Sequence, residues 1–264
     1  VLTNTLNVGL MQDALVEYMV RRCEKDEVPL KSLNPVVAEC NDSYLNHISK
    51  RAVKEEHLFA AIDAATEDFQ MGDVGAGKGT ICHGLKGGIG SASRIIEIDG
   101  KQYTLGVMVQ SNYGRLADLT IAGHPVGKTI AELAAAPKNE SDKGSIIMVV
   151  GTDLPVSERQ LERIIKRASV GLARLGSYVG HGSGEIMIGF STASRTAYDE
   201  QSVRSIDVIP EGMIDRAFRA TAECTEEAVL DSMICAKAVT GWEDHHINSL
   251  ADWLENSQVQ DALR

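Results

Sequence analysis

The residues with the clearest chemical potential lie at the start of an apolar segment, where Gly144 and Ser145 precede the run from Ile146 to Val150. If the bond before Ser145 is cut, this serine carries both a hydroxyl and a free α-amine. Such an amine has a pKa of about 7.7–8.0, well below that of a lysine, and it can accept the hydroxyl proton near neutral pH. Gly144 has no Cβ to obstruct attack of the hydroxyl on the preceding carbonyl. From spacing alone, a plain junction of loop and strand is the simpler interpretation.

Two other glycine-rich segments contain residues that could do chemistry. Residues 72–80 nearly match a phosphate-binding loop, but Gly79 takes the place of the hydroxyl that would hold Mg²⁺, and no helix pattern follows. We therefore predict that Gly72 to Thr80 form a turn cluster or a flexible loop near a site. Residues 181–185 resemble a nucleophile elbow, but His181 stands where the elbow needs glycine, and a strand pattern follows Ser183. A glycine-rich turn that enters a strand is the alternative.

The elements that must position these residues follow from apolar periodicity. Helical spacing predicts four helices, over residues 9–23, 54–69, 157–175 and 213–239. The third begins with a capping box of Ser157 and Gln160 and ends before Gly176. The chain from 134 to 144 is small and polar, and it is the one candidate for a linker.

β-branched runs predict the strands. Residues 93–98 and 102–110 flank Asp99-Gly100, a pair that favours a type I′ turn and hence an antiparallel hairpin. Two more strands are predicted over 145–150 and 185–191, joined by the helix that starts at Ser157. Helices and strands in mixed order, with a hairpin among them, predict an α+β layered sandwich. We expect residues 1–264 to form a single domain.

The acidic balance of the chain argues against a nucleic-acid partner. Lys and Arg total 26 against 37 Asp and Glu in 264 residues, and the net charge of −11 repels a phosphate backbone. Five scattered cysteines without zinc-site spacing predict reduced thiols and no metal site, and together with the lack of a leader pattern they predict a cytoplasmic location. We expect no cofactor. No apolar run has the length of a membrane span, so we expect no membrane partner.

Several separate motifs together resemble the L-aminopeptidase/D-esterase family, which includes the β-peptidyl aminopeptidases. The resemblance extends from Leu2 to about His246. The motifs are Thr3-Asn4-Thr5 with Val8-Gly9, Gly87-Gly88-Ile89-Gly90, Tyr103-Thr104-Leu105-Gly106-Val107, Gln110-Ser111-Asn112-Tyr113-Gly114, Gly144-Ser145-Ile146-Ile147 and His181-Gly182-Ser183-Gly184-Glu185. The resemblance implies an α+β fold built as a four-layer αββα sandwich. Its layering is that of the N-terminal-nucleophile hydrolases, with different connectivity.

The same resemblance implies a self-processing hydrolase. The precursor would cut itself between Gly144 and Ser145, which separates residues 1–144 from residues 145–264. Ser145 would then be the nucleophile at the new N-terminus, and Asn112 would stabilise the oxyanion. The implied reaction releases N-terminal amino acids from small peptides, amides or esters through an acyl-enzyme, without a cofactor. The family also implies a homo-oligomer, a tetramer of processed pairs.

Three further residues have roles implied by the family. Ser183 and Glu185 match the pair that bonds the amine and hydroxyl of Ser145 and helps to hold the substrate amino group, and Tyr44 matches a pocket tyrosine. Ser183 and Glu185 are two positions apart, so they share a face if the segment is extended. A carboxylate there would pair with a substrate ammonium, which would explain selection of unblocked N-termini.

The chain departs from the family pattern in two places, and two alternatives stay open. The family implies a further segment before Thr3, and it more often has Ala at the position of Ser111 and His or Phe at that of Tyr113. One alternative function is acyl transfer as in the ornithine acetyltransferases, which share the self-cleavage logic but use a threonine nucleophile. The other is a non-catalytic homologue whose Gly144–Ser145 bond stays intact.

Overall fold

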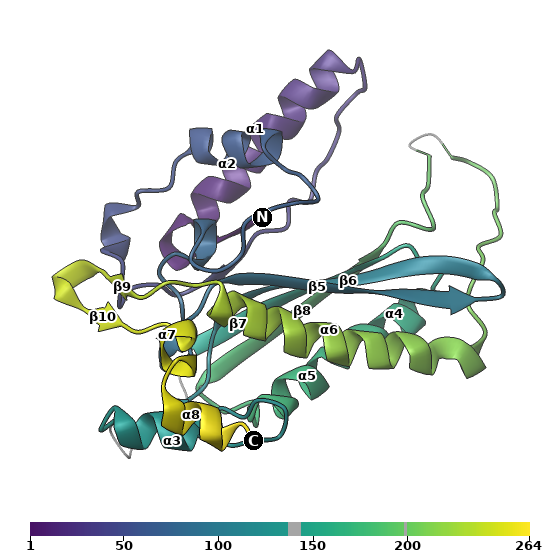
Figure 1. Cartoon of the computed structure of the whole chain (residues 1–264). Helices are drawn as coiled ribbons and strands as arrows, with labels where there is room; N and C mark the ends of the chain where they lie inside the picture. The colour runs from purple at the N-terminus through teal and green to yellow at the C-terminus, as the bar shows by residue number, and fades with distance from the viewer. Residues whose placement is uncertain (137–143, 198–199) are drawn as a thin grey trace.

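The computed structural model describes residues 1–136, 144–197 and 200–264. Its central sheet has four strands in the order β5-β6-β7-β8, with bounds Ile89–Ile98, Lys101–Asn112, Gly144–Thr152 and Ser183–Ser191. The first three strands pair antiparallel, whereas β8 runs parallel to β7 (Figure 1). The predicted hairpin is confirmed, since Asp99 and Gly100 connect β5 to β6 with φ of 53° and 70°, the left-handed pair that a type I′ turn requires.

One face of this sheet is covered by α4 (Glu158–Ile165), α5 (Ala168–Arg174) and α6 (Ile214–Ile234). The capping box of Ser157 and Gln160 is confirmed at the start of α4. The single helix predicted over 157–175 is wrong. At Arg167 and Val170 the main-chain N–H donates to the carbonyl three residues earlier instead of four, which interrupts the α-helix. The break lets α5 lie against α6 at Gly171, where a Cβ would come within 2.6 Å of the Ala222 carbonyl oxygen.

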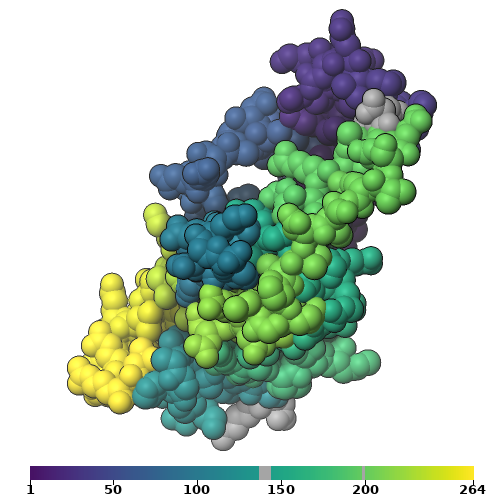
Figure 2. Space-filling view, turned by 90° about the vertical axis from the view of Figure 1, so that its right-hand side faces the viewer, coloured from purple at the N-terminus to yellow at the C-terminus, as the bar shows by residue number. Residues whose placement is uncertain are grey.

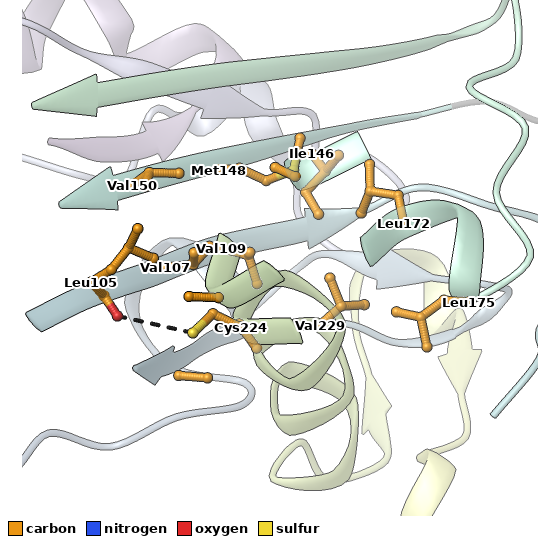
Figure 3. Close-up of a cluster of buried hydrophobic side chains, with 14 of the residues drawn as sticks. Leu105, Val107, Val109, Ile146, Met148, Val150, Leu172, Leu175, Cys224 and Val229 are labelled. Atoms are coloured by element: carbon orange, nitrogen blue, oxygen red, sulfur yellow. Dashed lines mark hydrogen bonds between the residues drawn. The ribbon is translucent and has the colours of Figure 1, made fainter. Parts of the chain in front are cut away.

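The main core lies between the sheet and these helices. Alternate residues of β6 and β7 point toward α5 and α6, as the two-residue period of a strand requires, and their side chains interdigitate (Figure 3). The labelled members are Leu105, Val107, Val109, Ile146, Met148, Val150, Leu172, Leu175, Cys224 and Val229. This packing fixes which face of β7 is left for Ser145, because Ser145 alternates with the buried Ile146.

The opposite face of the sheet meets a short parallel pair, β1 (Leu2–Asn4) and β2 (Ala38–Cys40). Beyond that pair lie α1 (Val8–Lys25) and α2 (Glu55–Asp63), which enclose a second small cluster of Met11, Ala14 and Leu58. The order of layers is therefore helix, sheet, strand pair, helix, and the α+β class is confirmed. In Figure 2 the purple N-terminal and yellow C-terminal residues lie at opposite ends of the molecule.

Two predicted helices end earlier than periodicity indicated. The helix predicted over 54–69 stops at Asp63, because residues 65–69 are exposed and find no surface to pack against. The helix predicted over 213–239 stops at Ile234. There the main chain turns to meet Gly72, at which a Cβ would lie 2.4 Å from the main-chain carbon of Cys235, and the N–H of Lys237 donates to Asp73 Oδ1.

The remaining elements are short and gather around the edges of the sheet. Two antiparallel pairs are β3 with β4 (Ile81–Cys82 and Leu85–Lys86) and β9 with β10 (Val239–Thr240 and His246–Ile247). The other helices are α3 (Val126–Leu133), α7 (Leu250–Leu254) and α8 (Ser257–Ala262). No helix within the described ranges combines the length and apolar character that crossing a membrane demands.

Candidate active site

A pocket of about 860 Å³ opens where β6 ends and β7 begins. Its wall includes Ser145, Asn112 and Tyr44, three residues that sequence analysis singled out from distant parts of the chain. Glu39, at the end of β2, also faces this space and accepts a hydrogen bond from the hydroxyl of Thr5. The pocket therefore combines a nucleophilic side chain, an amide donor, an aromatic wall and a carboxylate.

Asn112 and Ser145 occupy directly paired positions on adjacent antiparallel strands. The side chain of Asn112 is 8% exposed and held at both ends. Its Oδ1 accepts a hydrogen bond of 2.9 Å from the main-chain N–H of Ile81, and its Nδ2 donates over 3.1 Å to the carbonyl oxygen of Asn41. An amide nitrogen carries two hydrogens, so among the described residues one N–H of Asn112 remains available to a ligand in the pocket.

Gly144 adopts a backbone conformation that other residues rarely reach, with φ at +136°. A Cβ at this position would lie 2.0 Å from the main-chain carbonyl oxygen of Asn112. Position 144 thus requires glycine both for its torsion angle and for its contact with β6. The linker predicted before it falls largely on residues 137–143, which lie outside the described residues.

Ser183 and Glu185 lie on β8, in register with Gly144 and Ile146 of β7. Their side chains consequently project on the face opposite to that of Ser145, which instead has Gly184 as its partner. The two side chains flank the main chain at the predicted cleavage point and do not line the pocket. Among the described residues, neither Ser183 Oγ nor Glu185 Oε1 has a hydrogen-bond partner, although both atoms are buried. Two buried acceptors without donors are what a nearby ammonium would satisfy.

Tyr44 forms an outer wall of the pocket. Its side chain is 48% exposed, and its ring stacks on that of His245 with centroids 4.1 Å apart and an interplanar angle of 5°. The Nδ1 atom of His245 also lies 2.7 Å from the main-chain oxygen of Tyr44. The stack and the bond together fix the orientation of an aromatic surface that is still open to a ligand.

Cys40 is the other potential nucleophile close to Ser145. Its Sγ lies 3.5 Å from the carbonyl oxygen of Gln110 and 3.6 Å from that of Ser145. Burial raises the pKa of the Cys40 thiol to about 12, so it stays protonated at neutral pH. A protonated, fully buried thiol is a poor nucleophile.

The residues that hold Asn112 had no signal in the sequence. Ile81 and Asn41 act through main-chain groups, which any residue supplies, and Glu39 reaches the pocket only because β2 packs across β7. The glycine-rich segment 72–80 is a turn cluster, as predicted, with a 3₁₀ turn at Gly75–Gly77 and strand β3 after it. Lys78 of this loop pairs with Asp73.

A second cavity, of about 570 Å³, lies between α1, α2 and this loop, and none of the predicted site residues borders it. Across residues 1–136, 144–197 and 200–264, no three His, Cys, Asp or Glu side chains cluster in a way that could hold a metal ion.

The model of peptidase family S58 matches residues 1–247. The chain belongs to peptidase family S58. Among curated proteins, the S58 chain is 39% identical over 263 residues to the β-peptidyl aminopeptidase BapA of Sphingosinicella microcystinivorans. This alignment includes 94% of the chain but spans only 65% of the length of the relative.

Solved structures agree with the S58 assignment. The PH0078 protein from Pyrococcus horikoshii OT3 superposes with a TM-score of 0.88 at 47% identity, over 99% of the S58 chain and 72% of the other. The L-aminopeptidase D-Ala-esterase/amidase from Ochrobactrum anthropi has a TM-score of 0.87 at 34% identity, over 99% and 71% of the two chains. That structure is described as a variant of the N-terminal-nucleophile hydrolase fold, which is the fold class expected for this S58 chain.

Proposed function

We propose that this S58 chain is the catalytic part of an enzyme that cuts itself between Gly144 and Ser145 and then acts as a serine aminopeptidase. Its substrates would be small peptides, amides or esters with a free amino terminus. The observation that carries the proposal is the pairing of Ser145 with Asn112 at the rim of one pocket. A hydroxyl and an oriented amide N–H on adjacent strands are the two groups that acyl transfer needs first.

Self-cleavage follows from the position of Gly144. The Oγ of Ser145 gives up its proton and attacks the carbonyl carbon of Gly144, the C–N bond breaks, and the nitrogen takes up that proton to become the α-amine of Ser145. The glycyl group is then held as an ester on Oγ. Water hydrolyses this ester, which leaves a carboxylate on Gly144 and a serine with a free amine and a free hydroxyl.

Turnover uses the amine that cleavage has freed. With a pKa near 8, the amine takes the proton from Oγ as the hydroxyl attacks the first carbonyl of the substrate. The spare N–H of Asn112 stabilises the oxyanion that forms, and the amine returns the proton to the leaving group. An acyl-enzyme results, and a water molecule activated in the same way releases the amino acid.

Two carboxylates bind two different positively charged groups in this proposal. Glu185, with Ser183, flanks the main chain where the amine of Ser145 would form, so we assign this pair to that amine. Glu39 lies on the pocket side with Ser145 and Tyr44 and suits the ammonium of the substrate. The homo-oligomer of processed pairs expected from the resemblance is part of the same proposal.

Intact-mass measurement of the purified protein tests self-cleavage directly. We expect the wild type to convert into two fragments that separate at the 144–145 bond and to release nitroaniline from aminoacyl-p-nitroanilides. A Ser145→Ala variant should stay one chain and be inactive. Ser43→Ala is the matched control, because Ser43 also lines the pocket and should be dispensable. Processing of Ser145→Ala at the normal rate would exclude Ser145 as the nucleophile.

Product analysis with and without an acceptor amine separates hydrolysis from acyl transfer.

A further inference from the structure

Lys86, in strand β4, is a charged side chain with 0% exposure. Its Nζ donates to three main-chain carbonyl oxygens, those of Gly77 at 2.8 Å, Thr80 at 2.7 Å and Gly87 at 2.7 Å. These bonds use all three hydrogens of an ammonium. In the described part of the chain, no carboxylate lies within salt-bridge distance of this Nζ.

Burying an ammonium without a counter-ion is costly, and here the burial lowers the pKa of Lys86 to about 8. Three bonds to neutral carbonyls offset part of that cost, and an apolar residue in this place would remove a donor from each of the three carbonyls. Lys86 therefore holds the main chain of Gly77, Thr80 and Gly87 around one buried ammonium.

One of the three acceptors connects Lys86 to the candidate active site. Lys86 bonds the carbonyl of Thr80, and the same peptide group supplies the N–H of Ile81 that donates to Asn112 Oδ1 over 2.9 Å. The Thr80–Ile81 peptide thus lies between a buried positive charge and the amide assigned to the oxyanion. A cation on the carbonyl side polarises a peptide group and strengthens its N–H as a donor, and hydrogen bonds in such a chain reinforce one another.

This chain of hydrogen bonds ends at the side-chain amide of Asn112. A stronger bond at Oδ1 of Asn112 draws electron density toward that oxygen and makes the Nδ2 hydrogens better donors. One of these hydrogens is held by the carbonyl of Asn41, which orients the amide, and the other is left for the oxyanion. We propose that Lys86 is a positioning residue, which orients and polarises Asn112 through the Thr80–Ile81 peptide. This inference rests on the proposed function.

A double-mutant cycle separates this role from a merely structural one. Processed wild type, Lys86→Met, Asn112→Ala and the double variant are compared with an aminoacyl-p-nitroanilide. We expect Lys86→Met to lower kcat about tenfold with KM within about twofold, the size of one charged hydrogen bond. In the Asn112→Ala background the same change should lower kcat by less than about twofold, because its target is gone. An equal loss of kcat in both backgrounds would overturn the proposal.

Lys78→Met is the matched control. Lys78 belongs to the loop 72–80, which supplies two of the carbonyls that Lys86 bonds, but its own Nζ bonds Asp73 at the surface, so its loss should leave kcat unchanged. If Lys86→Met does not give folded protein by circular dichroism, Lys86→Gln takes its place, since it keeps two N–H donors without the charge. If Asn112→Ala matures too slowly to be purified as processed enzyme, the measurable rates of self-cleavage of the four precursors are the readout, with the same expected coupling.

The outcomes distinguish a failure of the proposed function from a failure of the role proposed for Lys86. A wild type that is neither cleaved nor active would overturn the proposed function and this inference together. An active wild type whose kcat is insensitive to Lys86→Met would refute the role of Lys86 alone.

Discussion

Asn112 and Ser145 are register partners across β6 and β7, at the point where one strand ends and the other begins. Paired positions on antiparallel strands bring Cβ atoms within about 4.5–5.5 Å of each other, so the two side chains share one small volume. The sheet itself thereby sets the distance between the proposed nucleophile and the proposed oxyanion donor. The pairing is fixed by a long ladder that continues to Leu105 and Thr152, and it does not depend on a mobile loop.

Replacement of Asn112 by Ala should lower kcat by about 10²–10³, the usual cost of losing one oxyanion donor. KM should change little, because the donor acts on charge that develops in the transition state. Steady-state kinetics on the processed variant give both values. Asn41→Ala is the control, since it keeps the main-chain oxygen that orients Asn112 and should stay within about threefold of the wild type in kcat. A similar loss in both variants would argue against a specific role for the amide.

Replacement of Gly144 by Ala should slow self-cleavage by at least about tenfold, because backbone strain of this kind costs on the order of 1–3 kcal/mol. The new Cβ would meet the carbonyl oxygen of Asn112 at 2.0 Å, so the main chain at position 144 must shift from the geometry that it has here. The uncut fraction is followed by intact mass over time. Gly184→Ala is the matched control on the neighbouring strand, where a Cβ would lie at an ordinary 3.8 Å from Ser145 Cβ. Equal cleavage rates in the two variants would contradict the steric argument.

Elements whose signals are local were predictable from the sequence. Asp99-Gly100 indicated the hairpin of β5 and β6, and the capping box of Ser157 and Gln160 indicated the start of α4. The ends of helices that depend on contacts distant in the sequence were not predictable. The end of α6 at Ile234 depends on the main chain near Gly72, and periodicity within α6 holds no trace of that neighbour.

The candidate site was likewise predictable only in part from the sequence. Ser145, Asn112 and Tyr44 do meet in one pocket. These residues could be singled out beforehand because the resemblance to the family identifies them by residue type. The placement of Ser183 and Glu185 on the face opposite to the Ser145 side chain depends on the parallel register of β7 and β8. That register arises from tertiary packing, so it was visible only in the structure.

Replacement of Glu39 by Gln should weaken selection for a free amino terminus. We compare an aminoacyl-p-nitroanilide with its 2-hydroxyacyl analogue, in which a hydroxyl replaces the ammonium. The preference of kcat/KM for the amino substrate should fall about tenfold, the value of one charge-assisted hydrogen bond. Glu56→Gln removes the same charge from α2, outside the pocket, and should preserve the preference. Retention of full selectivity in Glu39→Gln would assign ammonium recognition to another group.

Thiol modification should leave the enzyme active if Ser145 is the nucleophile. Burial raises the pKa of Cys40 and of Cys82 to about 12, so only about one thiol in 10⁴ of each is ionised at pH 8. Cys235 is exposed, and we expect it to account for the fast phase with Ellman's reagent, a phase that Cys235→Ser should abolish without loss of activity. Because burial raises the pKa of both thiols, the unfolded chain loses these protons first, and stability should fall as the pH rises above the ordinary thiol pKa. Rapid labelling of Cys40 at pH 8 in native protein, with parallel loss of hydrolysis, is the result that would make this cysteine, rather than Ser145, the candidate nucleophile.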